Sequence, residues 1–374
     1  MAATAIGIIE DEAGCAVDWI FIMTAMGGIH IPRYPIIRHE WLSLLTEEPI
    51  EPDLPIIDPH HHLWDHTGAR YMFDDLMADL NTGHNILATV YAQAYAMYRS
   101  DGPEALRPIG EIEFANGAGA MSASGIYGPA RACAGIIGFV DLRLGTAVDD
   151  ALQAAVAAGN GRLKAIRHIT AWDRDISIRG TASQAVPNML ADPAFRQGFS
   201  QLANHDLTFD AFLYHTQLDE LTDLAQSFPD THIVLDHAGT PLGVGRFMDK
   251  RDEVLNDWKR SIDRLATCPN VSVKLGGLAM KNCGFQLDQS PLPPSSEYLA
   301  EIWSPFVDHC IGRFGPSRCM FESNFPVDKG FVSYGVLWNA FKRMAKSYDQ
   351  KEKQRLFSET ANQIYRLGLD ACAP

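Results

Sequence analysis

The sequence predicts an α/β fold, a (β/α)8 TIM barrel formed by a single domain. Eight strand-like apolar runs follow one another, and each is followed by a helix or by a long loop and a helix. The 374 residues are sufficient for one barrel of this kind. A doubly wound open sheet is the main alternative. It is disfavoured because no Gly-x-Gly-x-x-Gly sequence opens a helix after an early strand.

The predicted strands are short apolar runs bounded by turn residues, and helix-like segments separate them. Strands are expected at residues 54–57, 86–93, 135–141, 163–168, 207–215, 232–237, 271–275 and 319–326. Helices are expected at residues 101–113, 148–158, 192–204, 217–227, 249–267, 296–314, 333–347 and 349–367. Residues 1–35 differ from the rest and are expected to form an N-terminal extension, so that the barrel domain covers residues 36–374.

Three polar loops, at residues 116–132, 171–187 and 276–295, are expected to follow strands. In a barrel of parallel strands, the loops after the strands form the face that carries the active site. These three loops are therefore expected to cap that face.

The composition argues against two classes of partner. The formal net charge is −15, whereas phosphate binding needs clustered Lys and Arg, so no nucleic-acid partner is expected. The apolar stretch at residues 17–29 is too short to span a bilayer and contains Asp18, so no membrane partner is expected either. We expect a small-molecule substrate, and a homo-oligomer is left open.

The seven cysteines are odd in number, scattered and without a Cys-x-x-Cys pair. This pattern indicates free thiols, which are typical of the reducing cytoplasm. A cytoplasmic location is therefore expected.

The motif Asp58-Pro59-His60-His61-His62 follows the first predicted strand. Side chains alternate between the two faces of an extended chain, so Asp58, His60 and His62 should share one face. Two imidazoles placed in this way can bind a single metal ion such as zinc. They could instead hold a substrate carboxylate, or simply pack at the end of the strand.

Polar residues also stand at the ends of the other predicted strands. These residues are Gln93, Arg167, His215, His237, Lys274, Glu322 and Asn324. One histidine at a strand end more often caps a loop, but four histidines at the ends of three strands should converge on one barrel mouth. No Gly-x-Ser-x-Gly elbow is present, and neither Cys133 nor Cys310 has a local setting that suggests a nucleophile. Attack by water, assisted by a metal or by histidine, is therefore favoured.

Five segments carry a resemblance to a known family: Ile57-Asp58-Pro59-His60-His61-His62-Leu63-Trp64, Leu213-Tyr214-His215, Leu235-Asp236-His237-Ala238-Gly239-Thr240-Pro241, Lys274-Leu275-Gly276-Gly277-Leu278 and Met320-Phe321-Glu322-Ser323-Asn324-Phe325-Pro326. Over about residues 53–368 the chain resembles the amidohydrolase-2 group of the amidohydrolase superfamily. It is most similar to the lactonase branch, which includes 2-pyrone-4,6-dicarboxylate lactonase and fuconolactonase-like proteins. The resemblance implies a (β/α)8 barrel that hydrolyses a lactone or a similar acyl bond.

The resemblance also implies roles for the histidines. In metal-bearing members, His60 and His62 would be metal ligands, joined by His215, and His237 would either support those ligands or be the acid/base histidine. The expected cofactor is one divalent metal, with zinc favoured, although some members of the branch work without a metal. Arg167 and Lys274 would hold a substrate carboxylate or polarise the carbonyl group, and Gln93 is a further substrate-binding candidate.

The eighth strand departs from the family. Where members usually read Gly-Ser-Asp-x-Pro, this chain reads Glu322-Ser323-Asn324-Phe325-Pro326. An amide at position 324 cannot take a proton from water, but Glu322 should share a face with Asn324. We interpret Glu322 as the displaced catalytic carboxylate, and expect it near His60, His62 or His237. The alternative is an inactive site in which Glu322 pairs with Arg167 or Lys274.

Three functions are compatible with these features. The first is a hydrolase that opens a small carboxylated or sugar-derived lactone. The second is a zinc-dependent non-oxidative decarboxylase, an activity of the same group. The third is a ligand-binding barrel that has lost its base. Products distinguish the first two, because ring opening and release of carbon dioxide are different reactions.

Overall fold

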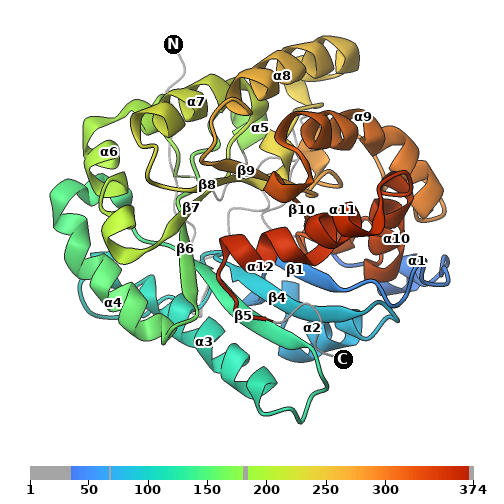
Figure 1. Ribbon diagram of the computed structural model, residues 1–374, viewed down its shortest axis with the longest axis horizontal. Coiled ribbons are helices and arrows are strands. Elements are labelled where there is room, and N and C mark those ends of the chain that lie inside the picture. The colour runs from blue at the N-terminus through green and yellow to red at the C-terminus, as the bar shows by residue number, and fades with distance from the viewer. Residues whose placement is uncertain (1–34, 67–68, 180–183, 370–374) are drawn as a thin grey trace, which may run out of the picture.

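A barrel of eight parallel strands lies at the centre of the protein, with helices around it (Figure 1). The computed structural model describes residues 35–66, 69–179 and 184–369, so that the predicted N-terminal extension lies almost entirely outside the described residues. In spatial order the strands are β1 (Ile56–His61), β4 (Ile86–Ala92), β5 (Arg131–Gly138), β6 (Leu163–Arg167), β7 (Thr208–Ala211), β8 (Ile233–Leu235), β9 (Val271–Leu275) and β10 (Cys319–Phe321). The predicted (β/α)8 barrel is confirmed.

The barrel closes between β1 and β10, through the residues that follow the two strands. A bridge pairs His61 with Phe325, and the backbone N–H of His62 donates to the Phe325 carbonyl at 2.7 Å. The N–H of Asn324 donates to the His60 carbonyl at 2.9 Å. The histidine motif and the segment around Asn324 are thus held side by side by the same backbone bonds that close the barrel.

Helices cover the outside of the barrel. They are α2 (Phe73–Leu80), α3 (Ile109–Ala123), α4 (Asp149–Gly159), α6 (Pro193–Phe199), α7 (Leu218–Ser227), α8 (Arg251–Leu265), α9 (Ser296–Phe314) and α10 (Tyr334–Met344). In α8 the buried residues are Val254, Trp258, Ile262 and Leu265, the spacing of one helical stripe. Shorter elements are α1 (His39–Leu42), α5 (Ile176–Arg179) and the hairpin of β2 (Trp64–His66) with β3 (Ala69–Tyr71).

One predicted loop is wrong. The predicted loop covered residues 116–132. Residues 116–123 belong to α3, and the residues after them lead into the start of β5 and do not follow a strand. Alanine is the best helix former, which extends α3 through this Ala-rich stretch. Gly119 lets the helix approach the barrel, because a Cβ atom there would lie 2.8 Å from the Cys133 carbonyl oxygen. This segment therefore does not cap the active-site face.

The C-terminal segment closes the end of the barrel at which the strands begin. It comprises α11 (Gln350–Gln354), a π-helical turn (Arg355–Glu359) and α12 (Thr360–Ile364), which lies across the barrel in Figure 1. Tyr365, directly after α12, is buried among interior residues such as Val90 and Val234. The side chain of Arg366 donates to the carbonyl of Lys164, close to the start of a strand. A mouth is thus left at the carboxyl ends of the strands.

Two predictions from composition bear on the described residues. The five cysteines among them are all free and buried, in agreement with the predicted free thiols. No described helix combines the length and the apolar character needed to cross a membrane.

Candidate active site

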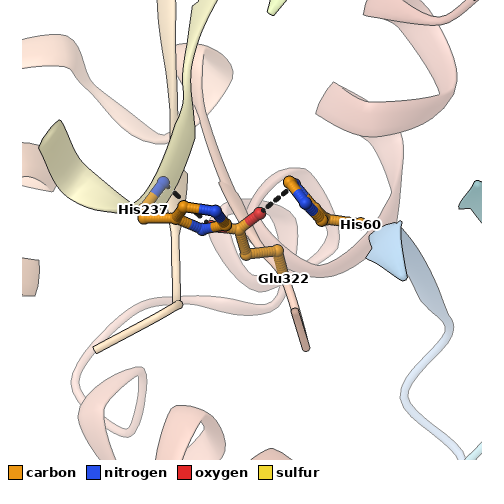
Figure 2. Close-up of side chains that lie close together, drawn as sticks. All are labelled: His60, His237 and Glu322. Carbon is orange, nitrogen blue, oxygen red and sulfur yellow. Dashed lines mark hydrogen bonds and ion pairs between the residues drawn. The ribbon is translucent and has the colours of Figure 1, made fainter. Parts of the chain in front are cut away.

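Three buried side chains meet at the carboxyl end of the barrel: His60 from β1, His237 after β8 and Glu322 after β10 (Figure 2). The Glu322 Oε1 atom accepts from His237 Nδ1 at 2.7 Å and from the His237 backbone N–H at 3.0 Å. The Glu322 Oε2 atom lies 2.8 Å from His60 Nδ1. The expectation that Glu322 lies within reach of these histidines is confirmed, because it bridges two of them.

The turn after β8 aims His237 at Glu322. His237 and Ala238 have left-handed backbone φ angles of 56° and 49°, so the chain turns sharply as it leaves the strand. Gly277, after β9, lies against the imidazole, and a Cβ atom there would stand 2.4 Å from His237 Nδ1. Because Gly277 also has a φ of 64°, only glycine suits both the space and the backbone.

The charge of Glu322 is set by its neighbours. Burial alone would raise the pKa of Glu322, but the nearby His237 and His60 outweigh burial and lower it below the ordinary value. A carboxylate that accepts several N–H donors is ionised over the usual pH range and is a poor proton acceptor. Glu322 is therefore better suited to orient the two imidazoles than to take a proton from water.

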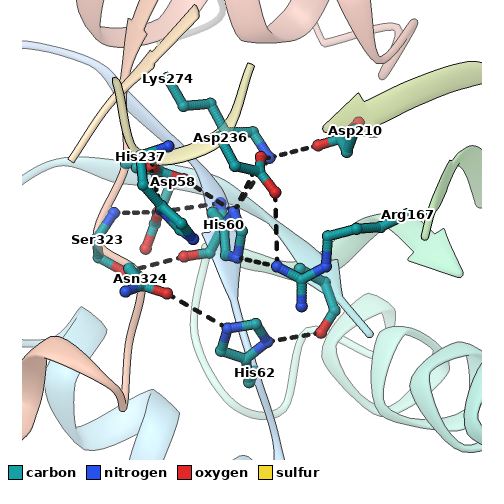
Figure 3. A network of polar contacts seen from close by, with 12 residues as sticks. Asp58, His60, His62, Arg167, Asp210, Asp236, His237, Lys274, Ser323 and Asn324 are labelled. Atoms are coloured by element: carbon teal, nitrogen blue, oxygen red, sulfur yellow. Dashed lines mark hydrogen bonds and ion pairs between the residues drawn. The ribbon is translucent and has the colours of Figure 1, made fainter. Parts of the chain in front are cut away.

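Lys274, from β9, is buried beside His60, and Figure 3 shows its side chain next to Asp210 and Asp236. Its Nζ atom is 2.6 Å from Asp210 Oδ2, 3.1 Å from Asp236 Oδ1 and 3.2 Å from His60 Nδ1. Burial would lower the pKa of Lys274, but Asp210 and Asp236 raise it above its ordinary value, so the amine stays charged. The side chain is fully buried, and its charge is matched by Asp210 and Asp236, so it is not free to bind the substrate as predicted.

Arg167 is held on the opposite side of His60. Its NH1 atom donates to His60 Nε2 at 3.0 Å, and its NH2 atom donates to the Gln93 carbonyl oxygen. Two other nitrogens, Arg167 Nε and Gln93 Nε2, are buried and have no hydrogen-bond partner in the described part of the chain. A buried donor without a partner costs about 1–3 kcal/mol.

Glu111, which was not predicted from the sequence as a site residue, holds the backbone that follows Gln93. Its Oε1 atom accepts from the Tyr91 hydroxyl at 2.8 Å, from the Ala94 N–H at 2.6 Å and from the Ala96 N–H at 3.2 Å. The residue is buried in the first turn of α3. Burial raises the pKa of Glu111 to about 7. An acidic residue in a helix is ordinary in a sequence, so no local signal marks this role.

Glu111→Gln should change how stability depends on pH. Burial raises the folded-state pKa from 4.5 to about 7, so wild-type protein loses stability as the pH rises through this interval. The glutamine variant has no such loss, and should gain roughly 3 kcal/mol relative to wild type across it. Urea unfolding of both proteins at pH 4.5 and pH 8 measures the difference. A difference that does not change with pH would show that Glu111 titrates normally.

His62 and His215, which were predicted to join His60 as metal ligands, lie outside the trio. His62 Nδ1 is 2.7 Å from the Ala92 carbonyl oxygen, and its Nε2 atom faces Asn324 Oδ1 at 3.4 Å. The His215 Nδ1 atom accepts from the Leu242 N–H at 3.2 Å. Burial lowers the pKa of His215 to about 4, so this ring is neutral. The geometry instead groups His60 with His237 and Glu322, whose ligand atoms lie within 4.8 Å of one another.

Asp58 connects the two strands that close the barrel. Its Oδ1 atom accepts from the Ser323 N–H at 2.9 Å, and its Oδ2 atom accepts from the Tyr334 hydroxyl at 3.0 Å. Asp58 also lies close to the His60 backbone N–H, at 3.3 Å. Its role is therefore to hold the motif in place, and it does not join the cluster of possible ligands among the described residues.

Comparisons with known proteins agree with this architecture. The family model described as amidohydrolase matches residues 57–367. A Sinorhizobium fredii protein, y4mH, is 30% identical over 342 residues, which are 84% of this chain and 99% of the relative. An L-fucono-1,5-lactonase of Burkholderia multivorans is 29% identical over 321 residues, 83% of this chain and 96% of the relative. The crystal structure of an amidohydrolase from Burkholderia multivorans with bound zinc has a TM-score of 0.64 at 23% identity, covering 83% of this chain and 99% of that chain.

Proposed function

Because the chain belongs to the amidohydrolase family and is therefore a hydrolase, we propose that it opens a small, neutral, hydroxyl-rich lactone by attack of water on the ring carbonyl. The observation that carries this proposal is the buried pair of His237 and Glu322 at the barrel mouth. The relatives named L-fucono-1,5-lactonase act on a lactone of this kind, according to their names, and support the choice of substrate class.

The hydrogen bond between His237 and Glu322 determines which nitrogen is free to react. An ionised carboxylate only accepts hydrogen bonds, so His237 Nδ1 carries the proton that it shares with Glu322 at 2.7 Å. The other nitrogen, Nε2, then has a free lone pair and can take a proton from the attacking water. Glu322 would stabilise the resulting imidazolium. The imidazolium then returns the proton to the ring oxygen as the single bond between the carbonyl carbon and the ring oxygen breaks.

The negative charge that develops on the carbonyl oxygen needs N–H donors nearby. Gln93 Nε2 and Arg167 Nε are suited to this role, because both are buried and without a hydrogen-bond partner among the described residues. The Tyr95 N–H donates to Gln93 Oε1 at 3.3 Å, which fixes the other end of that amide. Donors held in place before the reaction stabilise such an oxyanion without having to reorganise.

The charges around the site favour a neutral substrate. Lys274 is matched by Asp210 and Asp236, and Arg167 lies 3.5 Å from Asp236 Oδ2. A substrate carboxylate would meet Glu322 with no unmatched cation in this network to balance it. Dicarboxylate lactones are therefore disfavoured, in contrast to the earlier expectation that Arg167 and Lys274 bind a substrate carboxylate.

A pocket of about 200 Å³, which the residues of the trio do not line, would take the hydroxyl groups of such a substrate. It lies between the loops that follow β8 and β9, and its lining includes Gln286, Gln289 and Phe331. The only charged side chains in the lining, Lys281 and Asp288, pair with each other at 3.2 Å. Amides and an apolar wall can bind a sugar ring without a charge on the ligand.

A divalent metal fits the same trio. Two imidazoles and one carboxylate are a common ligand set for catalytic zinc, and His60, His237 and Glu322 bring these atoms together in a buried position. A related amidohydrolase structure contains zinc. A bound metal would polarise the lactone carbonyl and make water a stronger acid. Metal-free catalysis by His237 remains the alternative.

The function is tested with a matched pair of lactones, L-fucono-1,5-lactone and 2-pyrone-4,6-dicarboxylate. Wild-type protein should release acid from the first with much higher kcat/KM than from the second, and should release no carbon dioxide. His237→Ala, assayed in parallel, sets the background. Preference for the dicarboxylate would overturn the assignment of substrate class. Release of carbon dioxide would identify a decarboxylase, and no turnover above the His237→Ala background would indicate a ligand-binding barrel.

A further inference from the structure

Asp328, in the turn after β10, is a buried carboxyl group that the mechanism above does not use. Its Oδ1 atom accepts from Asn324 Nδ2 at 2.9 Å, and its Oδ2 atom accepts from the Ala279 N–H at 3.4 Å. The side chain is 0% exposed, and within the described ranges it forms no ion pair with lysine or arginine. Burial raises the pKa of Asp328 to about 7. Keeping such a group buried is costly unless its contacts are needed.

The principal side-chain partner of Asp328 is Asn324, whose backbone is fixed on two sides. The Asn324 N–H donates to the His60 carbonyl at 2.9 Å, and the Asp328 N–H donates to the Asn324 carbonyl at 3.1 Å. The left-handed φ of 54° at Asn324 turns its side chain towards the site. With the backbone held, the main freedom that remains is rotation of the amide about its last torsion, which is soft.

An amide presents a donor at one end and an acceptor at the other, and a carboxylate beside it takes the donor end. Asp328 takes the Nδ2–H of Asn324, and the Oδ1 atom is consequently directed to His62, 3.4 Å away (Figure 3). Without an acceptor at position 328, nothing on that side would hold the Nδ2 end, and the amide could rotate.

We propose that Asp328 is a positioning residue that acts through Asn324: its carboxyl group holds the Asn324 amide so that the amide oxygen faces His62 and the reaction centre. This inference rests on the proposed function for its chemical meaning. An amide oxygen does not remove a proton from water, but it accepts a hydrogen bond and so orients the water while His237 takes the proton. Asn324 would then be a water-orienting group in place of the base usual in the family.

A double-mutant cycle on L-fucono-1,5-lactone tests whether Asp328 acts through Asn324. Asp328→Ala should lower kcat about 10-fold with KM within about twofold, since misplaced catalytic groups affect the chemical step. In an Asn324→Ala background, Asp328→Ala should have no further effect. Asp328→Asn should restore most of the activity, because its amide oxygen can also accept the Asn324 Nδ2–H. Independent effects that multiply would overturn the proposal, as would an Asp328→Asn variant as poor as Asp328→Ala.

Asp79→Ala is the matched control for loss of a buried carboxylate. Asp79 is nearly buried and binds Lys329, the neighbour of Asp328, at 2.6 Å, but has no contact with Asn324. Its removal should lower the melting temperature while its effect on kcat stays small and multiplies with that of Asn324→Ala. A cycle in which Asp79 and Asp328 behave alike would show that Asp328 is merely structural.

A second measurement is independent of the substrate. In protein labelled with ¹⁵N at histidine, Asp328→Ala should shift the His62 Nε2 resonance, and the shift should be absent when Asn324 is already alanine. If wild-type protein turns over neither lactone, the proposed function fails. The comparison of His62 resonances among these variants still decides whether Asp328 positions Asn324. An unchanged His62 resonance in Asp328→Ala would overturn the positioning role, and so would a shift that persists without Asn324.

Discussion

Glu322→Gln is expected to lower kcat at least ~100-fold, while the protein remains folded. Glu322 accepts a hydrogen bond from the His237 side chain at 2.7 Å and lies 2.8 Å from His60 Nδ1, and glutamine offers only one oxygen for these two contacts. The substitution also removes the negative charge that would stabilise protonated His237. In a comparable dyad, the amide replacement of an orienting carboxylate strongly reduces turnover because the imidazole adopts the wrong tautomer.

The matched control is Glu111→Gln, the same chemical change at another fully buried carboxyl group. Glu111 supports the loop after β4 but does not contact the trio, and its glutamine variant should keep kcat within a few-fold of wild type. Both variants should unfold cooperatively in urea. Near wild-type turnover of Glu322→Gln would mean that Glu322 is only a structural residue.

The pH–rate profile separates two roles for Glu322. The earlier interpretation, in which Glu322 is itself the base, predicts that the acidic limb of the profile disappears in Glu322→Gln. The lowered pKa of Glu322 argues that this group stays ionised well below neutral pH. The limb should instead persist in the variant, because a carboxylate that is already ionised across this pH range does not produce it. Loss of the limb would restore Glu322 as the base.

Replacement of His60 or His237 by alanine is expected to reduce kcat by roughly 10³-fold, within the range for loss of an acid–base group. Both residues lie at strand exits, where substitutions affect function more than the core. His215→Ala is the matched control, since His215 is buried and neutral but lies outside the trio, where it accepts the backbone N–H of Leu242. Its kcat should stay within about 10-fold of wild type. Circular dichroism and thermal unfolding establish that each variant is folded.

The metal content of the same variants distinguishes the two ligand sets. The family resemblance implies His60, His62 and His215, whereas the structure groups His60, His237 and Glu322. Elemental analysis of purified wild-type protein should find about one divalent ion per chain if a metal is bound. His237→Ala should then lose the ion and His215→Ala should keep it. The reverse result would support the set that the resemblance implies.

Much of the fold and part of the site follow from the sequence alone. The alternation of eight apolar runs with helices is a local pattern, and it correctly predicted the barrel. Strand ends in a parallel barrel meet at one face, so the convergence of His60, His237 and Glu322 could be anticipated although they are far apart in the chain. The predicted loop at residues 116–132 failed because a Gly- and Ala-rich composition does not separate a loop from a closely packed helix.

The roles of individual side chains were decided by the tertiary structure. Lys274 is a strand-end lysine in the sequence, and only its contacts with Asp210 and Asp236 show that its charge is already matched. At position 324 the sequence shows only that the carboxylate usual in the family is replaced by an amide. Only the fold places Asp328 next to Asn324. Hydrogen-bond partners, charge balance and pKa depend on distances of a few ångström between segments that the chain order does not specify. For that reason the sequence predicted which side chains lie at the barrel mouth, but it could not predict their hydrogen-bond partners or protonation states.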